Sequence, residues 1–97
     1  MPSYILLTQW TDQGIRHAKG APKRQQDARE MAKKFGVEWK SVYMTMGAYD
    51  FVMTIEAPDD AAVAKFVLSL CALGNVRTTT LKAFTETEYR AIIDAAA

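Results

Sequence analysis

Short runs rich in β-branched and aromatic residues alternate with longer amphipathic segments along the chain. Four runs have strand composition, at residues 3–10, 37–46, 51–57 and 76–84. The first run is apolar throughout its middle, which is typical of a central strand covered on both faces. The break that begins at Gly47 separates the second and third runs, and a short connection containing a glycine predicts a hairpin.

Three other segments have the period of an amphipathic helix. The first begins near Pro22 and ends at Gly36, and the second begins after Pro58 and ends at Gly74. Thr85 and the glutamate three residues later have the spacing of a capping box, which predicts a last helix. The apolar faces of the three helices are Ala28, Met31, Ala32 and Phe35, then Val63, Phe66, Val67 and Leu70, then Tyr89, Ile92 and Ile93. Residues 11–21 are expected to form a loop with room for a short helical turn.

The order of these elements predicts an α+β, ferredoxin-like β-α-β-β-α-β fold followed by a C-terminal helix. Right-handed crossovers place the two main helices on one face of a four-stranded antiparallel sheet. The other face is then uncovered, and Trp39, Tyr43, Met44 and Phe51 are the large side chains that would make it apolar. Two such sheets packed face to face bury this surface, so we expect a homodimeric α+β barrel, with a ring of dimers as a further possibility.

Composition limits the remaining choices. The 97 residues are expected to form one domain, residues 1–97, with an ordinary apolar fraction of 49%. The single cysteine, Cys71, excludes an intramolecular disulfide, and the single histidine, His17, excludes a two-histidine metal site within one chain. We expect no metal and no cofactor. No apolar run is long enough to span a bilayer and no secretory leader is recognisable, so the sequence predicts a cytoplasmic protein without membrane contact.

Charge is unevenly distributed. Residues 14–40 carry eight basic and three acidic side chains, a net +5, although the whole chain has a net charge of only +1. A basic segment attracts anions, either nucleic acids or small metabolites. No nucleic-acid-binding motif accompanies it, so we expect no nucleic-acid partner and interpret most of these charges as a solvated helix face.

The segment from Tyr43 to Asp59, which contains the tetrapeptide Gly47-Ala48-Tyr49-Asp50, resembles the signature of the GYD-domain family. Further similar stretches are the threonine-x-x-glycine turn at residues 11–14, the basic start of the first helix at residues 22–24, and residues 74–88. The resemblance extends over about residues 4–93. It implies a dimeric ferredoxin-like fold but no particular chemistry.

A looser resemblance links the chain to the effector domains of feast/famine transcription regulators. Those domains have a similar glycine-x-tyrosine-aspartate turn and bind amino acids at subunit contacts. This chain lacks their helix-turn-helix domain, so the resemblance does not extend to DNA regulation. Small dimeric-barrel monooxygenases and isomerases are a third group of similar fold, and their pockets lie between the sheet and the helices.

The Gly47–Asp50 turn is where we expect a ligand. Gly47 is suited to positive φ, and Asp50 either locks the turn through backbone amides or binds a ligand. His17 and Asp50 are the candidates for an acid or base. An anionic ligand group is favoured by the cations that precede or begin the first helix. The candidate ligand-binding residues are Tyr43, Gly47, Tyr49, Asp50, Trp39, Arg24 and Arg16.

Three functions remain open at this level. The first is a domain that binds a small molecule near the Gly47–Asp50 turn or serves in assembly, working as a homodimer. The second is a cofactor-free monooxygenase or isomerase, which needs a buried acid or base such as His17 or Asp50. The third is a purely structural interaction domain. The fold hosts many functions and does not decide among them.

Overall fold

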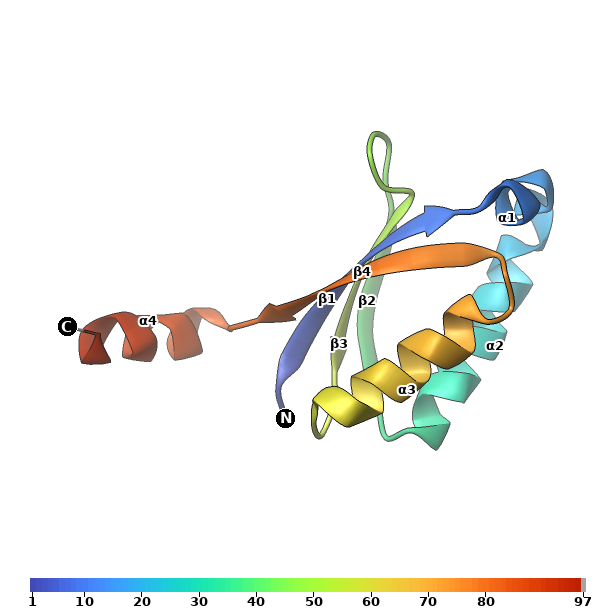
Figure 1. Cartoon of the computed structure of the whole chain (residues 1–97). Coiled ribbons are helices and arrows are strands. Elements are labelled where there is room, and N and C mark those ends of the chain that lie inside the picture. Colours follow the sequence, from blue (N-terminus) through green and yellow to red (C-terminus); the bar gives the residue numbers. More distant parts are fainter. Residues whose placement is uncertain (97) are drawn as a thin grey trace.

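The computed structural model of the chain describes residues 1–96, and its elements follow the predicted order (Figure 1). The ferredoxin-like β-α-β-β-α-β arrangement is confirmed, with a C-terminal helix after it. The predicted loop before the first long helix contains one short α-helix and one 3-10 turn. In order, the elements are β1 (Ser3–Trp10), α1 (Asp12–Arg16), the 3-10 turn η1 (Ala18–Gly20), α2 (Ala21–Lys34), β2 (Glu38–Met44), β3 (Phe51–Glu56), α3 (Asp60–Cys71), β4 (Val76–Ala83) and α4 (Glu86–Ala95).

Local interactions explain where the helices begin and end. The Asp59 carboxylate accepts a hydrogen bond from the Ala62 N–H at 2.9 Å and so caps the start of α3. Thr85 and Glu88 form the predicted capping box of α4, each accepting from the backbone N–H of the other. The chain turns just past α2 at Gly36, whose φ of +72° is the left-handed conformation that glycine adopts readily.

The four strands form one antiparallel sheet in the order β2-β3-β1-β4. The apolar first strand is therefore central, as predicted, but in one chain only its helix side is covered and not both faces. Helices α2 and α3 both lie on one face of the sheet (Figure 1). Between the layers lies a core in which Leu6, Ile55 and Phe66 are the largest fully buried side chains. The alternation along β1 is strict, because Tyr4, Leu6 and Thr8 are buried and their neighbours are not.

The opposite face of the sheet, which we call the open face, is covered by no element within residues 1–96. Cross-strand partners lie on the same side of a sheet, so Leu7 on β1 and its partner Val52 on β3 share this face with Tyr43 on β2. Of the four large side chains expected on the open face, only Tyr43 lies there. Phe51 lies on the helix side, because it shares one side of β3 with the buried Met53 and Ile55. Trp39 pairs with Ile55 and Met44 pairs with Phe51, so both lie on the helix side as well.

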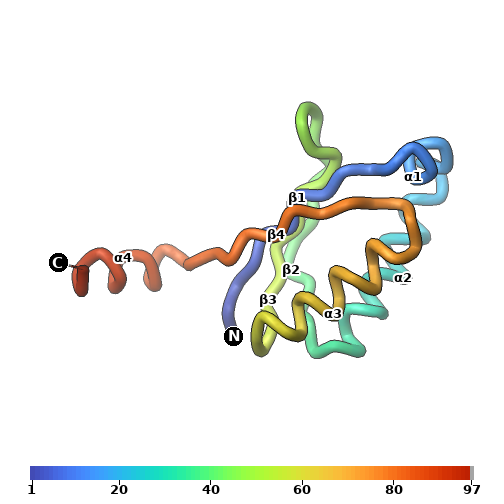
Figure 2. The backbone as a smooth tube through the Cα atoms, viewed as in Figure 1, coloured from blue at the N-terminus to red at the C-terminus, as the bar shows by residue number. Residues whose placement is uncertain are grey.

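Helix α4 extends away from the rest of the chain (Figures 1 and 2). The molecule is consequently elongated, with principal extents of 49 × 31 × 17 Å. Tyr89, Ile92 and Ile93 lie on one side of α4 as predicted, yet they are 49%, 47% and 64% exposed. Within residues 1–96, no helix combines the length and the apolar character needed to cross a membrane.

The buried ring of Phe66 is expected to be essential for stability. Phe66→Ala leaves a cavity between α3 and the sheet and should lower the free energy of unfolding by about 3–5 kcal/mol. Leu68→Ala, two residues along the same helix but 71% exposed, should change it by less than about 0.5 kcal/mol. Urea denaturation of both variants measures the difference, and equal losses would contradict the assignment of the core.

Candidate functional site

A cavity of about 80 Å³ lies between the helix side of the sheet and the two helices. We call it the sheet–helix cavity. Its walls are mostly apolar, and its few polar groups come from Thr8, Arg24, Gln25 and Asn75. The remaining lining residues are Trp10, Ala21, Ala28, Val42, Phe51, Met53, Leu70, Leu73 and Val76.

Thr8 is the most deeply buried polar residue of this cavity. Its side chain lies on the helix side of the central strand β1 and the residue is only 3% exposed. Its hydroxyl oxygen is buried and has no hydrogen-bond partner among residues 1–96. A hydroxyl in that position loses its water without gaining a replacement, so its capacity to form a hydrogen bond is unused among the described residues.

Asp50 holds the β2–β3 hairpin onto the end of β1. Its carboxylate accepts the Trp10 N–H at 2.8 Å, and its own N–H donates to the Thr8 carbonyl oxygen at 2.8 Å. These two bonds place Trp10 against Phe51 with an edge-to-face centroid distance of 5.1 Å. Asp50 therefore positions two aromatic walls of the cavity, which is the turn-locking role among the alternatives that the sequence left open.

Arg24 joins the cavity to the segment before α2. Its guanidinium donates to the carbonyl oxygens of His17 at 2.8 Å and Gly14 at 3.3 Å. Gly14 lies so close to the Asn75 backbone that an added Cβ would collide with the Asn75 carbonyl oxygen. The close contact explains why the residue at position 14 has no side chain, and it fixes α1 against the start of β4 near the cavity.

The other predicted site residues lie outside the cavity and are not brought together. Tyr43 is 67% exposed on the open face. Gly47 has the predicted positive φ, +119°, and lies in a projecting loop with open space around it. The Tyr49 carbonyl oxygen accepts a hydrogen bond from the Thr45 hydroxyl at 2.6 Å. Trp39 packs between Arg29 and Phe66. The Arg29 guanidinium carbon lies 4.8 Å from the centroid of the Trp39 ring, and the ring centroids of Trp39 and Phe66 are 6.4 Å apart.

Arg16 and His17 lie at the exposed end of α1. Within residues 1–96, the side chains of His17 and Asp50 make no hydrogen bond or ion pair with another titratable group. Among the same residues, no cluster of three or more histidine, cysteine or carboxylate side chains is arranged to hold a metal ion.

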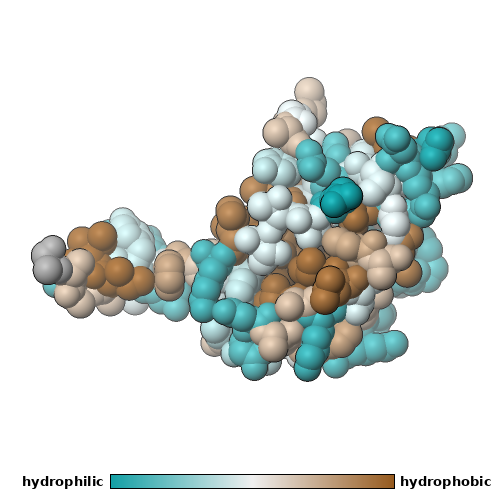
Figure 3. Space-filling model, in the orientation of Figure 1, coloured by the Kyte–Doolittle hydropathy of each residue, from teal (hydrophilic) through white to brown (hydrophobic). Residues whose placement is uncertain are grey.

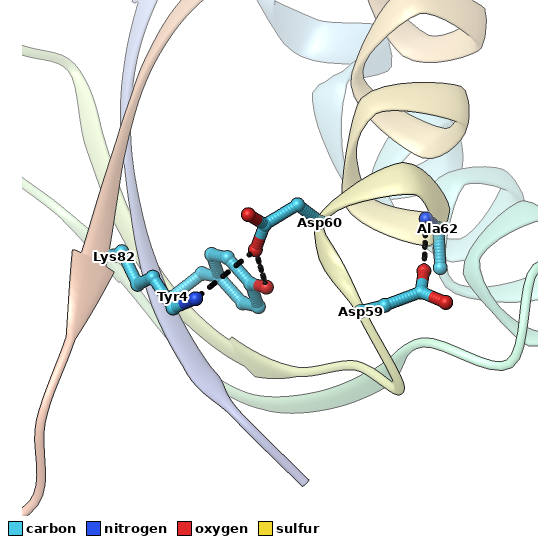
Figure 4. Close-up of polar contacts among 5 residues, drawn as sticks. All are labelled: Tyr4, Asp59, Asp60, Ala62 and Lys82. Atoms are coloured by element: carbon cyan, nitrogen blue, oxygen red, sulfur yellow. Dashed lines mark hydrogen bonds and ion pairs between the residues drawn. The ribbon is translucent and has the colours of Figure 1, made fainter.

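A second polar arrangement links α3 to the sheet at the other end of the molecule. The Tyr4 hydroxyl donates to the Asp60 carboxylate, which also receives the Lys82 ammonium at 3.4 Å (Figure 4). The hydrogen bond to Asp60, helped by burial of the ring, raises the pKa of Tyr4 to about 12. The same hydrogen bond, with Lys82 as the next cause, lowers the pKa of Asp60. The same three residues line a groove together with Val63, Val67 and Leu68.

Thr8 and Tyr4 are not among the site residues that the sequence predicts. The alternation along the first strand does single out Thr8. Tyr4, Leu6, Thr8 and Trp10 lie on one side of that strand, and the threonine is the only small polar residue among them. Nothing in the spacing of Tyr4 and Asp60 indicated their contact, since 56 positions separate them.

The raised pKa of Tyr4 predicts a specific loss of stability at high pH. The folded state holds the tyrosine proton more tightly than the unfolded state, so this contribution is complete below the ordinary pKa of 10.0 and is lost between about pH 10 and 12. Urea denaturation across this range should show the decline in the wild type and a weaker one in Tyr4→Phe. Asp60→Asn should also weaken it, whereas identical pH profiles in all three proteins would refute the assignment.

The sequence matches a known protein family and a named relative. The family model described as GYD domain matches residues 4–93. A Thermus thermophilus protein named "Glutamine synthetase and cystathionine beta-lyase binding protein" is 39% identical over 84 residues, which are 86% of this chain and 88% of that protein.

Solved structures agree on the fold. The crystal structure of a protein from Thermus thermophilus has a TM-score of 0.57 and 24% identity with this chain. The similarity covers 88% of this chain and 95% of that protein. A feast or famine regulatory protein from M. tuberculosis, solved with L-methionine, has a TM-score of 0.57 and 18% identity over 88% of this chain. This chain spans about half, 51%, of that regulator's length. Because the family model covers nearly all of the sequence, the chain belongs to the GYD domain family.

Proposed function

We propose that this chain is a homodimeric binding protein that recognises an enzyme through α4. The observation that carries the proposal is the position of α4, which extends from the end of β4 with its apolar side exposed (Figures 1 and 2). Apolar side chains are also visible along this helix in Figure 3. A helix of ten residues is marginal in water, so its stable form depends on a surface that covers this side.

The kind of partner is suggested by the relative that is 39% identical. Its name states that it binds glutamine synthetase and cystathionine β-lyase. We therefore take glutamine synthetase as the first enzyme to test with this chain. An exposed helix with apolar residues at positions 89, 92 and 93 is suited to a groove on a larger folded protein, because these positions recur on one side of the helix.

The open face supports the homodimer. Leu7 and Val52 are partners on the two central strands and are only half-buried in one chain, while Tyr43 and Leu81 are 67% and 44% exposed. Sheets pack face to face when such side chains interdigitate. A second copy supplies an identical sheet with a matching two-fold arrangement. Rings of dimers and the cytoplasmic location stay predictions from the sequence.

A ligand near the Gly47–Asp50 turn also stays a prediction, and the sheet–helix cavity at the base of that hairpin is its natural place. The alternative of a cofactor-free monooxygenase or isomerase has less support. Asp50 is bound to the Trp10 N–H, and His17 lies on the exposed end of α1, so neither is held as a buried acid or base.

Enzyme binding is tested with charges placed on α4. The double variant Ile92→Glu and Ile93→Glu should weaken the affinity for the purified glutamine synthetase of the same organism by about 100-fold, because two apolar contacts are replaced by carboxylates. Titration calorimetry with the wild type measures the reference affinity. Ala61→Glu, an exposed position on α3, is the control and should bind like the wild type. Equal binding by the α4 variant, or no binding by the wild type, would refute the proposal.

The homodimer is tested separately on the open face. Leu7→Lys buries a charge between the two sheets and should convert a dimer to a monomer, with half the mass in sedimentation velocity. The α4 double variant should keep the dimer mass. If the α4 variant is monomeric while Leu7→Lys remains a dimer, the helix and not the sheet joins the copies.

A further inference from the structure

We propose that the sheet–helix cavity binds a small organic anion. The ligand would have a short apolar body, one oxygen that hydrogen-bonds to Thr8 and a carboxylate that faces Arg24. The site is distinct from α4 and from the open face, so the inference goes beyond the proposed enzyme binding and does not depend on it.

The first observation is the unpartnered hydroxyl of Thr8. The residue is 3% exposed, lines the cavity and has no hydrogen-bond partner for its oxygen. Valine has the same shape and would fill the same place without an unpaired polar atom. A molecule in the cavity that offered an oxygen to this hydroxyl would remove the cost of leaving it without a hydrogen bond.

The second observation is the charge of Arg24. Within residues 1–96 its guanidinium forms no ion pair and donates only to two backbone carbonyl oxygens. An arginine has five N–H donors, so several are still free for a carboxylate. The two carbonyl contacts hold the group in place, so a ligand does not need to order a flexible side chain.

The position of Arg24 on α2 supports the same conclusion. It lies near the N-terminus of a 14-residue helix, where the helix dipole favours anions and disfavours a cation. Ala21, the first residue of α2, lines the cavity as well, so the positive end of the helix adjoins this space. A fixed cation and a helix N-terminus at one cavity together favour a negatively charged group.

The size of the cavity limits the apolar body. The volume is about 80 Å³, whereas an apolar cavity of about 150 Å³ holds one benzene molecule. The enclosed part of the ligand is therefore smaller than a benzene ring. Small side chains at Ala21 and Ala28 create the space, and the aromatic rings of Trp10 and Phe51 form part of its wall.

Three matched probes test the chemistry without any substitution. The probe 4-oxopentanoate carries both a ketone and a carboxylate, 4-methylpentanoate lacks the ketone, and 4-oxopentanamide lacks the charge. Titration followed by amide chemical shifts should give 4-oxopentanoate a dissociation constant of about 1 mM or below. The other two should bind about 5-fold or more weakly. The largest shifts should occur at residues that line the cavity.

Two variants locate the binding site. Thr8→Val should lower the affinity for 4-oxopentanoate by about 5-fold and change the affinity for 4-methylpentanoate by less than about 2-fold. Ala28→Leu fills the space and should abolish the shifts, whereas Ala61→Leu on the exposed side of α3 should not change them. The amide spectrum of each variant shows whether the fold is intact.

The inference is overturned if no probe shifts the cavity amides of the wild type, if all three probes bind equally, or if binding persists in a folded Ala28→Leu variant. Enzyme binding is measured on the same proteins. Loss of probe binding with intact glutamine synthetase binding would remove only the small-molecule site. The reverse result would remove only the proposed function.

Discussion

Two helices cover a four-stranded sheet on one face only, and the remaining features of the molecule follow from this asymmetry. The covered side holds Leu6, Ile55 and Phe66 in a closed core. The uncovered side leaves Leu7 and Val52 half-buried and Tyr43 exposed. Among residues 1–96 no element covers that side, and the last helix points away from the sheet. The buried core and the exposed apolar side chains thus lie on opposite faces of the same strands.

The sheet–helix cavity exists because the helices do not pack fully against one end of the sheet. Near the β2–β3 hairpin, alanines on α2 face the aromatic side chains of Trp10 and Phe51, and the layers do not close. Asp50 stabilises this end by bonding to the backbone of β1. The Gly47–Asp50 tetrapeptide thus contributes to the cavity through Asp50, whose carboxylate and N–H both bond to β1, while the tyrosine and glycine of the turn lie outside it.

The sequence predicted the elements, their order and the helix faces because periodicity and capping are local properties. The capping box at Thr85 and the stop at Gly36 are examples. It did not predict which face of the sheet Trp39 and Phe51 occupy, because that depends on strand register and on the irregularity between Trp39 and Ser41. The pairing of Tyr4 with Asp60 and the hydroxyl of Thr8 were missed because both depend on tertiary packing.

The exposed position of α4 also has a kinetic consequence. A short helix without a covering surface exchanges with unfolded forms, so its backbone amides should exchange with solvent faster than those of α3. A partner that bound this helix would have to offset the entropic cost of ordering it, which lowers affinity for a given contact area and permits rapid release. If α4 is the recognition element, an association through such a helix would suit a partner whose occupancy changes with conditions.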